Sequence, residues 1–153
     1  MSARDELPVE WFGGNLAAQD ACYSILRMSH TWDDLIDKDK PVSEVQINQA
    51  FLTALVYLPT NPFYRHIQDA VAPMWVTIVS AYEAANQFER EKDEYGVELA
   101  FMLRCAIGNI IAYAISVCIG AESARAVIPS MWKSVVGERY SDYRKEHLND
   151  HQE

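Results

Sequence analysis

Apolar residues recur every three or four positions along most of the chain, which is the period of one face of an α-helix. Over residues 16–37 the apolar positions, among them Ile25, Met28 and Trp32, fall on one side of a helical wheel. Asn15 directly precedes this stretch, and asparagine is a favoured N-cap residue. The pattern therefore predicts a first helix over residues 16–37.

Local start and stop signals divide the next part of the chain. Ser43 and Gln46 have the spacing of a capping box, and Pro59 is expected to end the helix that they begin. Asn61 followed by Pro62 is a second start signal, because proline is well tolerated in the first helical turn. We expect a second helix after Ser43 and a third after Asn61.

The third helix is expected to extend to about Glu91, and residues 93–96 form a predicted break. The fourth helix, over about residues 97–119, is apolar enough to cross a membrane. Arg104 and Asn109 lie inside it, however, and a charge at the centre of a bilayer is unfavourable. A helix buried in a soluble bundle explains the same pattern at a lower free-energy cost.

The core of the protein is expected along this fourth helix, with Ile107, Ile111 and Ile115 buried. A fifth helix is predicted over about residues 122–147, with interruptions at Pro129 and Gly137. The 153 residues suit one all-α domain of about five helices with a buried central hydrophobic helix. We place an irregular N-terminal arm at residues 1–14 and the single helical domain at 15–150.

Charge narrows the classes of partner. The formal net charge of −9 argues against a nucleic-acid surface and against an anionic membrane surface, because both need clustered Lys and Arg. A cation, a basic partner or a magnesium-complexed phosphate is easier to accommodate. We also expect self-association, most simply a homodimer, since half of the residues are hydrophobic.

Three cysteines, Cys22, Cys105 and Cys118, lie among apolar residues. An odd number of buried cysteines is typical of reduced thiols, so we expect a cytoplasmic protein without a disulfide framework. No basic-then-apolar leader opens the sequence, which favours the same location.

The main candidate for chemistry is the acidic run Asp33-Asp34-Leu35-Ile36-Asp37 at the end of the first predicted helix. On a helical wheel Asp33 and Asp37 lie about 40° apart and Asp34 about 100° away, opposite the apolar stripe. These carboxylates repel one another and meet the unfavourable end of the helix dipole, and a hard cation such as Mg²⁺ would relieve both effects. A solvated polar face, with Lys38 and Lys40 offsetting the charge, is the alternative.

This D-D-x-x-D run resembles the first aspartate-rich motif of class I isoprenoid (terpenoid and prenyl diphosphate) synthases. The resemblance implies an all-α bundle in which Asp33, Asp34 and Asp37 hold magnesium ions that bind a substrate diphosphate. It also implies a second metal motif on a facing helix, and the nearest matches are Asn86–Arg90–Glu94 and Asp142–Glu146–Asp150.

Two further groups of charged residues are candidates. Glu91 and Glu94 could form a second acidic cluster opposite Asp34 and Asp37, which resembles the paired acidic motifs of all-α nucleoside triphosphate pyrophosphatases; a solvated helix end is the alternative. Arg104 interrupts an apolar helix, so it needs a carboxylate partner or a phosphate if it is buried.

From these residues we expect a magnesium-dependent, diphosphate-binding helical protein resembling isoprenoid synthases. The alternatives are a pyrophosphatase-like hydrolase and a non-catalytic, oligomeric accessory or interaction protein of the phage type. Whether the chain is an enzyme is left open by the sequence. We expect no nucleic-acid partner and no membrane partner.

Overall fold

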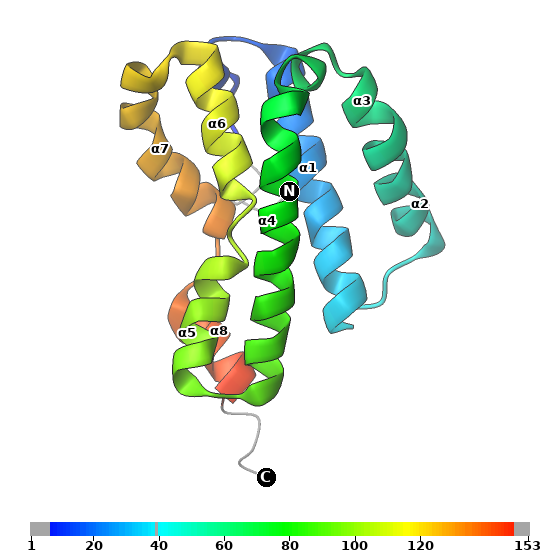
Figure 1. The fold of residues 1–153 in the computed structure, drawn as a ribbon, viewed down its shortest axis with the longest axis vertical. Helices are drawn as coiled ribbons and strands as arrows, with labels where there is room; N and C mark the ends of the chain where they lie inside the picture. Colours follow the sequence, from blue (N-terminus) through cyan, green and yellow to red (C-terminus); the bar gives the residue numbers. More distant parts are fainter. Residues whose placement is uncertain (1–6, 39, 149–153) are drawn as a thin grey trace.

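The computed structural model describes residues 7–38 and 40–148, and these residues form α-helices joined by short turns without any β-strand. The predicted all-α bundle is confirmed (Figure 1). Its elements, in chain order, are η2 (Val9–Phe12), α1 (Leu16–Asp37), α2 (Glu44–Leu52), the π-helix η3 (Thr53–Tyr57), α3 (Leu58–Thr60), α4 (Pro62–Glu91), α5 (Glu94–Leu103), α6 (Gly108–Ile119), α7 (Ala121–Val136) and α8 (Tyr140–Leu148).

The predicted helix starts are confirmed by their capping hydrogen bonds. The Asn15 side chain accepts from the backbone N–H of the third residue of α1, and the Asn61 side chain does the same for α4. Ser43 and Gln46 form the complete capping box at the start of α2. These bonds satisfy N–H groups that have no partner within a helix, which is why the starts could be predicted from sequence.

The helix ends also follow local chemistry. Lys38 and Lys92, at φ 58° and 55°, adopt the left-handed conformation that ends α1 and α4. Gly137 ends α7 in the same way, which confirms the predicted interruption there. Pro129 lies inside α7 without ending it, and Pro73 lies inside α4. The second predicted helix continues past Pro59 to Thr60 by way of the π-helical turn.

The fourth predicted helix requires a correction. Its sequence forms two helices, α5 and α6, separated by turns over residues 104–107. Its core role is nevertheless confirmed, because Ile107, Ile111 and Ile115 are at most 2% exposed. The stretch Glu94–Ile119 is also the one described segment long and apolar enough to cross a membrane, judged by length and composition alone.

Packing places the two ends of the bundle in different environments. The main core lies between α1, α4, α6 and α7, whereas a smaller apolar cluster joins α4, α5 and α8. In Figure 1, α4 runs the length of the molecule, with α6 and α7 beside its first half and α5 and α8 beside its second half. The second half is where α4, α5 and α8 meet the C-terminal end of α1, and it holds the charged residues described next.

Candidate functional site

Arg104, at the C-terminal end of α5, is the centre of a charged network. Its Nε and Nη2 atoms donate to the two carboxylate oxygens of Glu89 on α4, both at 2.5 Å. Its Nη1 donates to Asp33 on α1, and its Nη2 donates to Asp37 at 3.3 Å and to the amide oxygen of Asn86 at 2.6 Å. One guanidinium therefore ties α5 to both α1 and α4.

The network extends to α8 through Tyr143, whose hydroxyl donates to Glu89. Burial raises the pKa of the Tyr143 hydroxyl, and the hydrogen bond to Glu89 and the charge of that carboxylate raise it further, so the hydroxyl keeps its proton. Nε2 of His147, one turn further along α8, lies 3.8 Å from the same carboxylate. Glu89 thus links α8 to the arginine.

Burial and pairing set the charge states of the central pair. Burial lowers the pKa of Arg104, but hydrogen bonding to Glu89 and the charges of Asp33, Glu89 and Asp37 outweigh it, so the pKa lies above its ordinary value. For Glu89, burial raises the pKa, whereas hydrogen bonds from Arg104 and Tyr143 lower it below its ordinary value. Both groups are therefore charged near neutral pH.

An aromatic pair supports the arginine from the side of α4. The Tyr82 ring stacks on Trp32 of α1, with ring centroids 4.4 Å apart, and the Arg104 Cζ atom lies 5.8 Å from the centroid of the Tyr82 ring. Burial, followed by the charge of Asp33, raises the pKa of the Tyr82 hydroxyl. A neutral aromatic face next to a guanidinium adds a cation–π attraction.

The network borders an open cleft of about 870 Å³ between the end of α1 and α8. Its charged lining consists of six carboxylates and three Lys or Arg side chains, an excess of three negative charges: Asp33, Asp34, Asp37, Glu138, Asp142, Glu146, Lys40, Arg104 and Arg139. His30, Tyr143 and His147 complete the list of titratable lining groups. The resemblance named Asp142 and Glu146 as part of a second motif, and they share this cleft with the three aspartates.

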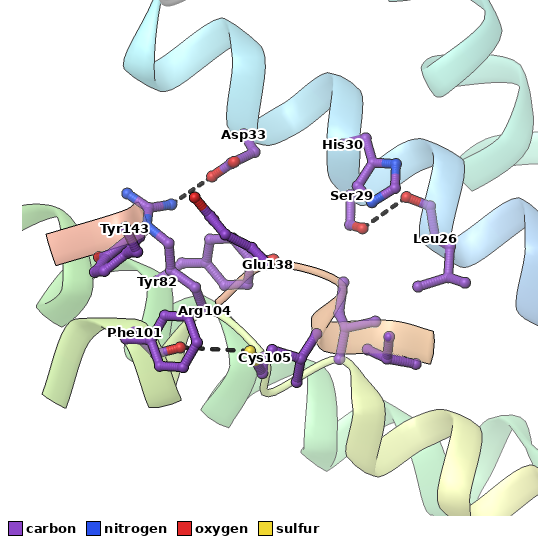
Figure 2. A pocket seen from close by; sticks show the side chains of 13 residues that line it. Leu26, Ser29, His30, Asp33, Tyr82, Phe101, Arg104, Cys105, Glu138 and Tyr143 are labelled. Atoms are coloured by element: carbon purple, nitrogen blue, oxygen red, sulfur yellow. Dashed lines mark hydrogen bonds and ion pairs between the residues drawn. The ribbon is translucent and has the colours of Figure 1, made fainter. Parts of the chain in front are cut away.

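A smaller pocket of about 110 Å³ lies beside the cleft and shares Asp33, Arg104, Glu138, His30 and Tyr143 with it. Figure 2 shows the Glu138 side chain reaching towards the Asp33–Arg104 pair, with Phe101 and Cys105 on the opposite side of Arg104. The remaining wall of the pocket is mainly apolar, with contributions from Leu26, Ile107, Val135 and Val136. The cleft therefore joins a charged mouth to a small recess lined by both polar and apolar side chains.

The predicted site residues divide into two groups. Asp33, Asp34, Asp37 and Arg104 line one cleft. Asp33 and Asp37 pair with Arg104, whereas the Asp34 carboxylate makes no hydrogen bond or ion pair with the residues that the structure describes.

Glu91 and Glu94 lie away from this cleft. Glu91 accepts from Gln87 at 2.7 Å, and Glu94 pairs with Arg144 at 2.6 Å. Of the motif Asn86–Arg90–Glu94, only Asn86 reaches the network. Asp150, the last residue of the other candidate motif, lies outside the described residues.

Sequence reasoning missed Glu89 and Tyr143. A signal for Glu89 was present, because Ile78, Tyr82, Ala85 and Glu89 are spaced four, three and four residues apart and all lie on the buried face of α4. A carboxylate at such a position needs a buried cation. Arg104, the arginine that interrupts an otherwise apolar helix, is that cation. Tyr143 gave no comparable signal, because α8 is polar and short.

Within residues 7–38 and 40–148, no three His, Cys, Asp or Glu side chains are grouped closely enough to hold a metal ion by themselves. No protein-family model, curated protein or solved structure matches this chain. The function is therefore inferred from the residues of the cleft alone.

Proposed function

We propose that this protein binds a ligand carrying a diphosphate group, together with magnesium, in the cleft between α1 and α8. The observation that supports this is a mouth that contains both carboxylates and arginines and adjoins a small recess partly lined by apolar side chains. A diphosphate–metal head suits the mouth, and a small, partly apolar group suits the recess of about 110 Å³. This ligand class is the one that the resemblance to isoprenoid synthases implies.

The carboxylates of the mouth have the chemistry of magnesium ligands. Mg²⁺ prefers oxygen ligands and is commonly held by one or two protein carboxylates, with water and substrate phosphate completing the shell. One or two of the carboxylates of Asp33, Asp34 and Asp37 would hold it at a time, so a cluster of three preassembled protein ligands is not required. Bound magnesium would supply the positive charge that brings phosphate oxygens to an acidic cleft.

The cations of the cleft have a complementary role towards phosphate. Arg139 and Lys40 are exposed at the mouth, where they can contact the outer phosphate oxygens. Arg104 is held by Glu89 through two hydrogen bonds, whereas its contact with Asp37 is longer at 3.3 Å. Asp37 can therefore give up its contact with Arg104 and bind a metal ion instead, while the Arg104–Glu89 pair stays in place.

The charge of the cleft predicts that the binding of diphosphate depends on magnesium. An excess of three negative charges repels a bare diphosphate, so diphosphate alone is expected to bind weakly. Bound magnesium makes part of the mouth attract the diphosphate instead of repelling it. Affinity for diphosphate is therefore expected only when magnesium is present.

Calorimetric titration tests this proposal. We expect measurable binding of pyrophosphate at millimolar Mg²⁺, little binding in the presence of chelator, and loss of binding in the variant carrying Asp33→Asn and Asp37→Asn. A matched control carries Asp69→Asn and Glu83→Gln, two exposed carboxylates of α4 outside the cleft. Absence of magnesium-dependent binding in the wild type, or its survival in the cleft variant, would overturn the proposal.

The same negative excess favours a second candidate, an interaction protein whose cleft receives a cationic group of a partner. Spermidine and a lysine-rich peptide are suitable probes. Binding of these probes that Mg²⁺ weakens, combined with no response to pyrophosphate, would favour this candidate over the first. The pyrophosphatase-like alternative is less well supported, since Glu91 and Glu94 lie away from the cleft.

A further inference from the structure

We propose that a second copy of this chain docks on the outer face of α2 and η3, forming a symmetric homodimer. This surface, the α2–η3 face, is defined by Phe51, Leu52, Leu55 and Val56, which are 63%, 44%, 71% and 42% exposed. In Figure 1, α2 and α3 form one edge of the bundle, and no described helix lies outside them. The inference is independent of the ligand proposed for the cleft.

The four side chains are neighbours because of their spacing. Phe51 and Leu55 are four residues apart, as are Leu52 and Val56, so each pair shares one side of the helix. Val45 and Tyr57 flank them, with 76% and 47% exposure. The exposed apolar positions therefore form a continuous surface along α2 and η3.

The π-helix explains how so apolar a segment divides between core and surface. Thr53 and Leu58, at the two ends of this turn, are buried against the bundle. The wider turn leaves Leu55 and Val56 between them on the outside. The Thr53 hydroxyl stabilises the segment by donating to the Gln49 carbonyl at 2.9 Å. π-Helical turns are rare and are often found at functional positions.

The exposed area is that of an interface. Six side chains that each leave on the order of 100 Å² uncovered amount to roughly 600 Å², the upper end of what monomeric proteins expose in one patch. A standard interface buries about 800 Å² per partner, of which rather more than half is apolar. The α2–η3 face together with its flanks supplies that apolar share.

The distribution of charge indicates that the partner at this face is a second copy of the chain. The chain carries a net charge of −9, so most contacts between two copies would bring like charges together. Residues 45–64 contain no Asp, Glu, Lys, Arg or His, which makes this face a part of the surface where two copies meet without repulsion. An anionic membrane would instead require Lys or Arg beside the apolar residues.

A two-fold axis through this face allows both copies to cover their exposed apolar residues in one contact. In such an isologous contact the same patch is used twice, so the apolar residues of one protomer cover those of its partner. No residue of 51–57 lines the cleft. Both clefts of the dimer therefore keep their access to ligand.

Sedimentation velocity tests the proposal, with wild-type protein from 1 to about 100 µM. We expect a dimer that dissociates on dilution, and we expect Leu55→Glu to weaken it at least about tenfold while circular dichroism and thermal unfolding stay close to wild type. The matched control is Val76→Glu on α4, since Val76 is 70% exposed and Leu55 is 71% exposed.

Three outcomes would overturn the proposal. One is a wild-type protein that stays monomeric at 100 µM, and another is a dimer that Val76→Glu disrupts but Leu55→Glu does not. The third is co-sedimentation with neutral phosphatidylcholine vesicles that Leu55→Glu abolishes, which would assign the face to lipid. If Leu55→Glu fails to fold, Phe51→Ser and Val56→Thr provide milder changes of the same face.

Discussion

The guanidinium of Arg104 and the carboxylate of Glu89 form a two-point ion pair, Nε to Oε1 and Nη2 to Oε2, each at 2.5 Å, in the interior of the bundle. The Glu89 side chain is 8% exposed and that of Arg104 is 12% exposed. Such a pair fixes geometry as well as charge, because both planar groups must align. It joins the turn after α5 to the buried face of α4.

Removing Arg104 is expected to destabilise the protein strongly. Arg104→Ala leaves the buried Glu89 carboxylate without its cation, and breaking such a pair typically costs about 3–5 kcal/mol. Arg104→Lys keeps the charge but loses the two-point geometry, so an intermediate loss is expected. Urea unfolding followed by circular dichroism measures both. The control is Arg144→Ala, whose pair with Glu94 is exposed to solvent and is expected to contribute little to stability.

Glu89 should contribute to the pH dependence of folding. Its folded-state pKa lies below its ordinary value near 4.5, because hydrogen bonds from Arg104 and Tyr143 outweigh the effect of burial. A carboxyl group of this kind stabilises the fold above its unfolded-state pKa, and the contribution is lost as the pH falls through the folded-state pKa. The free energy of unfolding should therefore fall below about pH 4.5, and less steeply in Glu89→Gln.

Urea titrations at pH 7, 5, 4 and 3 test this dependence. Glu83→Gln on the exposed side of α4 is the control, and it should keep the wild-type slope. An equal slope for Glu89→Gln and the wild type would show that Glu89 is not the group responsible.

Gly108 is expected to tolerate no side chain. A Cβ atom at this position would lie closer than 3.0 Å to three atoms of the Trp132 ring on α7. Gly108→Ala should therefore destabilise by about 1–3 kcal/mol, although alanine favours a helix over glycine. Gly108→Leu should cost more. Thermal unfolding measures the effect, and Asn109→Ala at the next, exposed position is the control.

The three cysteines should react slowly in the folded protein. Burial raises the pKa of Cys22, Cys105 and Cys118, and for Cys105 burial and the charge of Glu138 raise it to about 11. At pH 8 only roughly one thousandth of a thiol with that pKa is thiolate, the reactive form. Ellman's reagent should label all three in urea but hardly any in buffer. Ala126→Cys, exposed on α7, should add one fast-reacting thiol.

The acidic run shows how far sequence could predict the site. Mutual repulsion of Asp33, Asp34 and Asp37 led to the prediction of a magnesium ion at the run, whereas the structure shows that Arg104 bonds to Asp33 and Asp37. Asp33→Asn with Asp37→Asn should consequently weaken the ligand-free protein, because it removes two charged partners of Arg104. Magnesium binding at the run stays a prediction.

The sequence by itself determined the features that depend on neighbours along the chain. Helix starts at Asn15, Ser43 and Asn61 follow from side chains that bond to backbone groups three residues away. The buried positions of α6 follow from the helical period of its isoleucines. The need of Arg104 for a carboxylate follows from the apolar residues around it.

Only the tertiary structure decided which groups meet. Arg104 pairs with Asp33 across 71 positions of sequence and with Glu89 across 15, and neither pairing is encoded in local spacing. The break between α5 and α6 and the π-helical turn of η3 were likewise seen only in the structure. The physical reason is that local hydrogen bonds act within one turn, whereas burial of charge and close packing depend on which helices lie side by side.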